Sequence, residues 1–323
     1  MLSPPPDLAL DALAGALTRQ WGVAVRSVDY LAVGFGSHHW TVTDPAGGGW
    51  FVTVDDLAAR RRSDADSPDD VCARLGRALG AARALRDTGE TFVLAPVLTA
   101  GGGTVARLTD RYAASLYPLV EGESFEFAEY SDGEHRDAVL DMVVRVHGAP
   151  EQVRRRATED DLALRNRDAL EAALSGGVVA ECGPYAERAA RLLHDHAGQV
   201  RRLLARYDGL VAGADLGRSV LTHGEPHPGN TLRTKDGWRL IDWDTVRIAP
   251  PERDLWLLGG DLTAYTDATG VEVLPEMLTL FKLRWDIADL AMEVDRFRRP
   301  HTGDANDEKA WQILRWVVGG ISP

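Results

Sequence analysis

Residues 221–256 read LTHGEPHPGNTLRTKDGWRLIDWDTVRIAPPERDLW. The first ten positions hold two histidines, one carboxylate and one amide among prolines and glycines. On a helix, the four-residue spacing of His223 and His227 would suit a zinc site. Gly224 and Pro226 do not permit a regular helix, because glycine destabilises it and proline removes a hydrogen-bond donor. The segment is therefore expected to form an irregular loop, and a zinc site is not favoured.

The same loop carries the side chains that phosphoryl transfer requires. Glu225 and Asn230 lie five residues apart, and Asp242 follows twelve residues later at the end of a short apolar run. One carboxylate can orient the attacking hydroxyl and accept its proton, while an amide and a second carboxylate are hard oxygen ligands for Mg²⁺. Glu225 is the expected base, and Asn230 and Asp242 are the expected metal ligands. A capped turn between a helix and a hairpin is the structural alternative.

HGEPHPGN followed by LIDWDTVRIAPPERDLWLLGG resembles the aminoglycoside phosphotransferase family, most of all its spectinomycin-type and choline-kinase-like branch. The resemblance implies an α+β, bilobal, protein-kinase-like fold. It divides the chain into a nucleotide-binding lobe with an antiparallel sheet, residues 1–118, and a larger helical lobe for catalysis and substrate binding, residues 119–323. It also implies ATP, with GTP as the alternative, and Mg²⁺ with Asp244 as a further ligand. Asp254 is expected to hold the catalytic loop, residues 223–230, in place.

Further positions follow from the resemblance. A glycine loop over the phosphates and a hinge that binds adenine through its backbone are implied, and the third strand contributes one more nucleotide-binding position. The implied residues are Gly34, Gly36 and Ser37 in the glycine loop, Thr53 on the third strand, and Leu119 and Val120 at the hinge.

Two departures from the family pattern stand out. Glu225 occupies the place of an aspartate, which moves the carboxylate by one methylene. Thr53 occupies the place of a lysine that contacts the phosphates, and the helix predicted at 69–87 lacks that lysine's glutamate partner. Arginine suits phosphate recognition, so an arginine of the 60–62 run or Arg74 is the expected replacement. The structural alternative for each arginine is a solvated surface position.

Hydrophobic periodicity gives the remaining elements. A helix capped by Asp7 is expected first, then three strands around the turns GFGS and DPAGGG. The chain after about residue 120 is mostly helical, interrupted by a hairpin around KDG. The predicted helices are 7–20, 69–87, 134–147, 161–174, 184–208, 252–259 and 272–297, and further strands are expected at FVLAPVLTA, TVARL and YAASLYPLV.

Composition limits the functional classes. A net charge of -13 disfavours a nucleic-acid partner and would attract a cationic small molecule. An acidic surface that only aids solubility is the alternative reading. Two cysteines and the absence of a signal-like N-terminus or an apolar run of membrane-spanning length indicate a cytoplasmic protein without membrane association.

Acidic residues on the last predicted helix, spaced three and four apart, are expected to bind substrate ammonium groups, as the resemblance implies. A solvated helical face is the alternative reading. The predicted substrate-binding residues are Asp261, Asp286, Asp289 and Glu293.

The sequence thus predicts an ATP- and magnesium-dependent kinase that phosphorylates a hydroxyl of a small, cationic natural product such as an aminoglycoside-like antibiotic, a reaction associated with antibiotic resistance. A kinase acting on a serine or threonine hydroxyl of a peptide is a variant. A pseudokinase or a module that binds a nucleotide or partner without turnover is the alternative, because Thr53 replaces the lysine.

Overall fold

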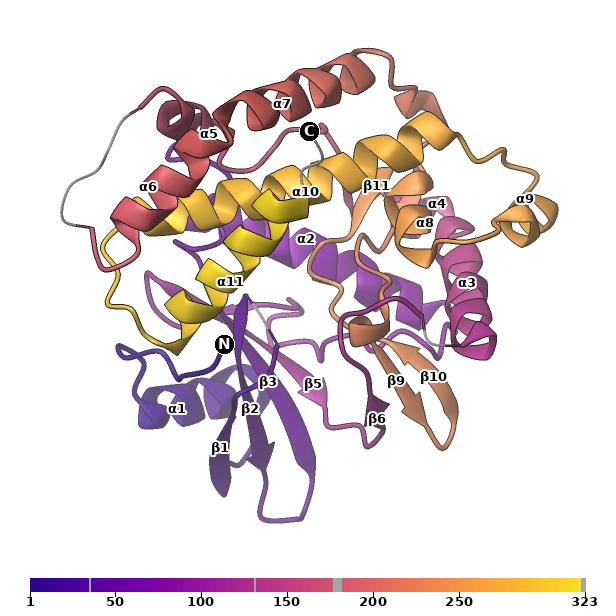
Figure 1. Ribbon diagram of the computed structural model, residues 1–323. Helices are drawn as coiled ribbons and strands as arrows, with labels where there is room; N and C mark the ends of the chain where they lie inside the picture. Colours follow the sequence, from indigo (N-terminus) through magenta and orange to yellow (C-terminus); the bar gives the residue numbers. More distant parts are fainter. Residues whose placement is uncertain (35, 131, 177–181, 321–323) are drawn as a thin grey trace.

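A computed structural model describes residues 1–34, 36–130, 132–176 and 182–320 (Figure 1). Phe35, in the expected glycine loop, lies outside the described residues. The N-terminal part carries a five-stranded antiparallel sheet, and the rest is mostly helical, as the sequence predicts. The strands of the sheet, in spatial order, are β1 (Ser27–Leu31), β2 (Ser37–Thr43), β3 (Gly49–Asp56), β5 (Tyr112–Pro118) and β4 (Ala106–Arg107).

The two faces of this sheet have different partners. Trp40, Val42 and Val52 form a core with Leu13 and Leu17 of α1 (Leu10–Trp21), because alternate residues of a strand point to opposite faces. The other face therefore points away from α1. It carries Ser37, Thr53, Asp55, Ser115 and Tyr117, by the pairing of Ser37 with Asp55 and of Thr53 with Ser115.

Helix α2 (Pro68–Asp87) connects the sheet to the helical part. Ser67 and Asp70 form a capping box at its start, and the predicted range 69–87 is confirmed. Leu75, Leu79 and Ala82 of α2 belong to one of the two large cores, together with residues of α3 and of the strands near the catalytic loop. The helix therefore positions the sheet against the loop that carries the predicted chemistry.

The helical part is built around α10, the long helix that crosses it in Figure 1. A second large core joins α10 to α5, α6, α7 and α11. Among the described residues, no helix has both the length and the apolar character needed to cross a membrane. The helices of this part are α3 (Gly133–His147), α4 (Glu151–Arg154), α5 (Arg167–Leu174), α6 (Ala186–Asp195), α7 (Ala197–Ala212), α8 (Glu252–Leu258), α9 (Thr263–Thr269), α10 (Pro275–Phe297) and α11 (Ala305–Gly320).

Two small sheets frame the catalytic loop. The predicted hairpin around KDG is confirmed, and a short strand near residue 123 adds to it. The second sheet joins segments far apart in the sequence: β11 pairs in parallel with β7 and antiparallel with β8. The strands are β6 (Glu123–Ser124), β9 (Thr231–Thr234) and β10 (Gly237–Leu240) in the first sheet, and β7 (Thr158–Glu159), β8 (Val220–Thr222) and β11 (Arg247–Ala249) in the second.

Several predicted elements are wrong in detail. Helix α1 begins at Leu10 with Ala9 as N-cap, and Asp7 forms an ion pair with Arg111 instead of capping the helix. The predicted strand 92–100 is an irregular segment, because its backbone makes single bonds to different strands and Pro96 cannot donate one. The predicted helix 184–208 is two helices that divide at His196, and helix α11 was not predicted.

Candidate active site

The loop between β8 and β9 contains the first two predicted catalytic residues. The backbone N–H of His227 donates to the carbonyl of Glu225 at 2.8 Å, and the amide Nδ2 of Asn230 donates to the same carbonyl at 3.0 Å. This bond assigns the two atoms of the amide, so that Oδ1 is the atom of Asn230 left for a ligand. Pro228–Asn230 forms one turn of 3-10 helix, which places Asn230 beside Glu225.

Asp254 of α8 anchors the start of this loop. Its two carboxylate oxygens accept the backbone N–H groups of His223 at 2.8 Å and of Gly224 at 2.6 Å. His147, at the end of α3, lies 3.1 Å from the same carboxylate. Burial alone would raise the pKa of Asp254, but the hydrogen bond and charge of His147 and the charge of Arg253 outweigh it and lower the pKa. The structure therefore confirms that Asp254 holds the catalytic loop.

Gly224 is required at its position for two reasons. Its φ of +102° lies in the region that residues with side chains rarely adopt, and a Cβ would overlap the guanidinium of Arg253. Arg253 in turn donates to Thr222 Oγ1 at 2.8 Å and to the carbonyl of Thr245 at 2.7 Å. The close approach of Arg253 thus depends on glycine and ties the catalytic loop to the segment after Asp242.

The segment 241–245 lies alongside the catalytic loop. The N–H of Ile241 donates to the carbonyl of Asn230 at 2.9 Å, and Thr245 Oγ1 donates to the carbonyl of His223 at 2.9 Å. Asp242, between these two contacts, has a φ of +62°, which is uncommon for a residue with a side chain. The structure thus brings Glu225, Asn230 and Asp242 together from two separate segments.

The three carboxylates at this point influence one another. Burial raises the pKa of Glu225 to about 7, and the charge of Asp244 adds to the increase. Asp242 is open to solvent yet surrounded by many protein atoms, as expected for a side chain that faces a cleft. These surrounding atoms raise its pKa well above the usual value, and the charges of Asp244 and Glu225 raise it further. Such mutual repulsion is typical of sites built to receive a cation.

Arg60 occupies the space between the sheet and these carboxylates. Its guanidinium contacts Asp55 of β3 at 2.7 Å, Asp244 at 2.5 Å and Ser37 Oγ at 2.9 Å. Thr53 and Asp55 lie two residues apart on β3 and point to the same face of the sheet. Arg60, one of the arginines named as candidate replacements for the lysine, reaches the same face from the loop that follows β3, and its role toward phosphate stays a prediction.

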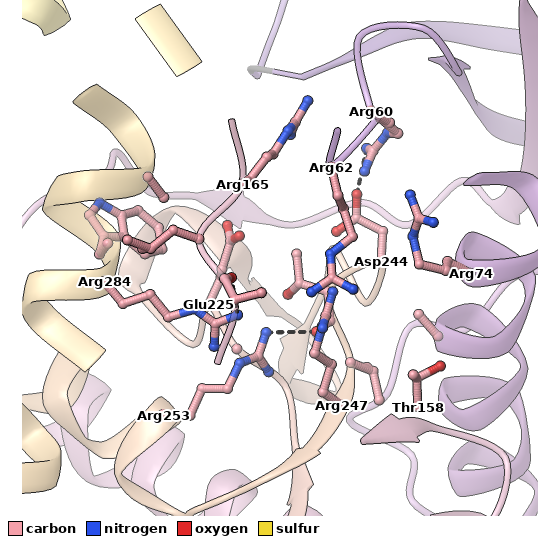
Figure 2. Close-up of a pocket in the computed structure, with 18 of the residues that line it drawn as sticks. Arg60, Arg62, Arg74, Thr158, Arg165, Glu225, Asp244, Arg247, Arg253 and Arg284 are labelled. Carbon is pink, nitrogen blue, oxygen red and sulfur yellow. Dashed lines mark hydrogen bonds and ion pairs between the residues drawn. The ribbon is translucent and has the colours of Figure 1, made fainter. Parts of the chain in front are cut away.

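A cavity of about 290 Å³ opens next to Glu225 and Asp244 (Figure 2). Residues of α2, of the segment 158–165, of the segment 244–247 and of helices α8 and α10 line it. Trp256 and Trp285 form part of its wall. Seven arginines surround it: Arg60, Arg62, Arg74, Arg165, Arg247, Arg253 and Arg284.

The predicted nucleotide-binding residues lie around the sheet. Gly34 and Gly36 both have positive φ in the connection between β1 and β2. Ser37 begins β2, and its hydroxyl donates to Asp55 at 2.7 Å. Leu119 directly follows β5, and its N–H donates to the carbonyl of Gly49 at 3.1 Å. Val120 is the next residue along the chain. Nucleotide binding by these residues stays a prediction.

The predicted substrate-binding acids do not form one group. Asp289 lies close enough to raise the pKa of Glu225, and Asp286 forms an ion pair with Lys282 at 2.8 Å. Glu293 is 2% exposed and sits 3.6 Å from Arg296. Asp261 accepts hydrogen bonds from Thr263 at the start of α9 and does not line the cavity.

The residues that surround the carboxylates fit a divalent cation held jointly with a nucleotide. In the part of the chain that the structure describes, no group of three or more His, Cys, Asp or Glu side chains is arranged to hold a metal alone. Asn230 and Asp242 offer two hard oxygen atoms, which is the number that nucleotide-dependent Mg²⁺ sites commonly take from protein. A metal here would therefore complete its coordination with phosphate and water.

Sequence reasoning missed Asp55, Asp160 and four of the cavity arginines, Arg165, Arg247, Arg253 and Arg284. Asp55 follows Thr53 by two residues on a predicted strand, so strand alternation could have placed it on the cleft face. Arg247 and Arg253 lie within the family motif and could have been found there. Asp160 and Arg284 belong to segments whose contact with the loop leaves no local signal.

Comparisons with known proteins identify the family and the fold of the chain. The profile described as the phosphotransferase enzyme family matches residues 30–291. Protein StrN of Streptomyces griseus is 34% identical over 240 residues, which cover 71% of this chain and 72% of StrN.

Solved structures show the same fold. The complex of spectinomycin phosphotransferase APH(9)-Ia with ADP and spectinomycin superposes with a TM-score of 0.73 at 15% identity, over 98% of this chain and 99% of that one. The GDP and kanamycin complex of APH(2")-IIia gives a TM-score of 0.59 at 15% identity, over 96% and 99% of the two chains. The chain therefore belongs to the phosphotransferase enzyme family and has the fold of the kinase-like antibiotic phosphotransferases.

Proposed function

We propose that the protein transfers the γ-phosphoryl group of ATP, with Mg²⁺, to a hydroxyl group of a small natural product. The observation that carries this proposal is the convergence of Glu225, Asn230 and Asp242 beside a cavity. These side chains come from two segments joined by the bond between Ile241 and Asn230. Mutual positioning of a base and two oxygen ligands is the main requirement of phosphoryl transfer.

Glu225 acts as the base in this proposal. Its pKa of about 7 makes both protonation states accessible near neutral pH, which suits a group that takes up a proton during the reaction. The acceptor oxygen bonds to the γ-phosphorus as the bond to the β–γ bridging oxygen breaks. The hydroxyl proton passes to the Glu225 carboxylate, and ADP leaves. The extra methylene of glutamate is accommodated by the loop, since the Glu225 carboxylate still lines the cavity.

Asn230 and Asp242 would hold the metal ion, with Asp244 nearby. When bound, Mg²⁺ offsets the charge of the phosphates and orients the group that is transferred. The repulsion among Asp242, Asp244 and Glu225 supports a cation at this point, because a bound cation lowers the free energy of such a cluster.

Arg60 takes over the work of the missing lysine. Its guanidinium already contacts Ser37 of the expected phosphate loop and Asp244 beside the metal site. Arginine binds phosphate with two parallel hydrogen bonds, so this position suits the triphosphate of ATP or GTP. Gly34, Gly36, Ser37, Thr53, Leu119 and Val120 complete the nucleotide site, between a lobe ending near residue 118 and the rest of the chain.

The relatives favour an antibiotic-like acceptor. Spectinomycin and kanamycin are present in the two solved structures that share the fold, and StrN is a Streptomyces protein. The net charge of -13 makes a cationic compound of this kind the first expectation. The side chains that face the acceptor decide its charge, however, and these are mostly arginines.

The test is turnover of ATP with a panel of hydroxylated antibiotics and metabolites. Asn230→Ala and Asp242→Ala should each abolish phosphoryl transfer while the protein stays folded. Asp236→Ala, which removes an exposed carboxylate from the turn between β9 and β10, is the matched control and should keep full activity. Full activity in both Asn230→Ala and Asp242→Ala would contradict the proposal.

A nucleotide-binding module without turnover is the second candidate. The observation in its favour is Thr53, because no lysine occurs before Lys235 in the chain. Calorimetry with ATP and Mg²⁺ followed by the acceptor panel separates the two. Nucleotide binding with no transfer to any acceptor would favour this candidate, whereas transfer that depends on Asn230 would exclude it.

A further inference from the structure

The cavity beside Glu225 has a charge opposite to that of the whole chain. The protein has a net charge of -13, yet seven arginines and only two carboxylates, Glu225 and Asp244, line this cavity. Figure 2 shows the labelled arginine side chains entering it from several segments of the chain. Side chains of this kind determine which ligands the cavity accepts, since they lie within contact distance.

Three of these arginines share a single carboxylate outside the lining. Asp160, which is 4% exposed, lies 2.6 Å from Arg284, 3.4 Å from Arg253 and 3.9 Å from Arg247. At ion-pair distance these three positive charges exceed the single charge of Asp160, and the other carboxylates that act on Arg253, those of Asp254 and Glu225, lie further away. The second carboxylate near Arg247, that of Asp161, is 3.9 Å away and is used by another arginine at 2.6 Å.

Arg165 adds a fourth positive charge without a carboxylate at ion-pair distance among the described residues. Its guanidinium donates to the backbone carbonyls of Ala59 and Arg61. Arg247 has an unused hydrogen-bond donor, because its buried Nη1 has no hydrogen-bond partner in the part of the chain that the structure describes. Burial lowers the pKa of both arginines to about 10, so the site is costly without a compensating anion.

We infer, on the basis of the proposed function, that the acceptor carries an anionic group and that Arg165, Arg247, Arg253 and Arg284 bind it. The guanidinium fork matches both a phosphate monoester and a carboxylate, so the inference concerns this shared chemistry. Glu225 lines the same cavity, and a hydroxyl of the bound acceptor would face it.

The volume of the cavity adds a limit on size. About 290 Å³ lies at the lower end of the range for ligand pockets, roughly 300–1,000 Å³. An acceptor of one ring, such as a phosphorylated or carboxylated sugar or cyclitol, fits this volume better than an aminoglycoside of three rings. Trp256 and Trp285 supply the apolar wall against which such a ring can pack.

The acids predicted to bind ammonium groups do not offset the surplus. Asp286 is paired with Lys282, and Glu293 is buried beside Arg296. Asp289 remains, and burial raises its pKa to about 7, so it is only partly charged at neutral pH. Apart from Glu225 and Asp244, a cationic acceptor would therefore meet four arginines and little opposing charge.

Calorimetry with four probes of the same ring size tests the inference. Glucose 6-phosphate and glucuronate are anionic, glucose is neutral and glucosamine is cationic. Binding is measured at constant ionic strength with Mg²⁺ and saturating ADP, so that the nucleotide site is filled. At least one anionic probe should bind about tenfold more tightly than glucose and glucosamine, a difference of about 1.4 kcal/mol. Comparing the two anions distinguishes phosphate from carboxylate.

Two variants and a matched control locate the binding. Arg165→Gln and Arg247→Gln should each lower the affinity for the preferred anion by about tenfold. Arg154→Gln removes a half-buried arginine that also bonds to a backbone carbonyl, that of Ser219 at 2.8 Å, but lies outside the cavity lining. This control should leave the affinity unchanged, and urea unfolding verifies that all three proteins are folded.

Several outcomes would overturn the inference. They are equal or weaker binding of the anions compared with glucose, tighter binding of glucosamine, anion binding blocked by ADP, and anion binding unaffected by both variants. ADP blockage would assign the arginines to the nucleotide phosphates. The proposed function fails separately: loss of transfer in Asn230→Ala together with no anion preference would keep the kinase and remove the anionic acceptor.

Discussion

The contact between Arg60 and Asp55 predicts a large coupling free energy. Arg60 lies 2.7 Å from Asp55, whose side chain is 3% exposed, and removing the guanidinium leaves this carboxylate buried without its ion-pair partner. Breaking a buried pair costs about 3–5 kcal/mol, and because Arg60 itself is 22% exposed we expect about 3 kcal/mol for Arg60→Gln. Removing both charged groups avoids the unpaired charge of Asp55, while the contact of Arg60 with Asp244 is lost in both Arg60 variants and cancels in the cycle, so the coupling should be about 2 kcal/mol.

The assay is urea unfolding of Arg60→Gln, Asp55→Asn and the double variant, in a double-mutant cycle. The control is the pair formed by Arg111 and Asp7, which has the same separation of 2.7 Å but is 48% and 61% exposed. Exposed pairs contribute about 0.2–1 kcal/mol. Equal coupling in the two cycles would refute the reasoning, because the two pairs differ mainly in burial.

Three further outcomes follow from the structure. Burial raises the pKa of Glu293 to about 7, so the protonated carboxyl is favoured in the folded state and the free energy of unfolding falls as pH rises from about 4.5 to 7. Relative to wild type, Glu293→Gln should therefore gain about 2–3 kcal/mol of stability between pH 5 and pH 8. A stability difference between the two proteins that stays constant with pH in urea unfolding would contradict this. Asp254→Asn places an amide donor against two backbone N–H groups, so kcat should fall about a hundredfold with less change in KM, and steady-state kinetics that show only a KM effect would argue against a positioning role. Gly224→Ala should destabilise the protein by more than about 1 kcal/mol, because position 224 has a positive φ and lies against Arg253. Gly209→Ala, at an exposed position of α7, should instead stabilise the protein by about 0.4–1 kcal/mol. Similar shifts of the melting temperature in the two variants would contradict this.

Local chemistry explains which elements the sequence predicted correctly. Helix α2 has its capping box and its apolar spacing within one continuous segment, and the hairpin after Asn230 has its turn residues at KDG. The catalytic loop is likewise defined by its own prolines and glycines. Because these signals act over a few residues, they can be read without knowing what packs against them.

Elements that depend on distant partners were not predicted. Strands β7, β8 and β11 are two or three residues long and form a sheet from segments near residues 158, 220 and 247. Such short strands have no periodicity to detect, and only the pairing makes them strands. The irregular segment 92–100 is the opposite case, because its apolar residues serve packing rather than strand pairing.

The amino-acid sequence alone was enough to predict the family and the mixed architecture, and to select Glu225, Asn230 and Asp242 as candidate site residues, because short motifs encode all of these. Tertiary structure alone decided the charge around the site. Arg60 reaches Asp55 on β3 from the loop that follows this strand, and arginines of separate segments gather around Asp160. The physical reason is that charge–charge interactions depend on distance in space and on burial, and neither quantity follows from spacing along the chain.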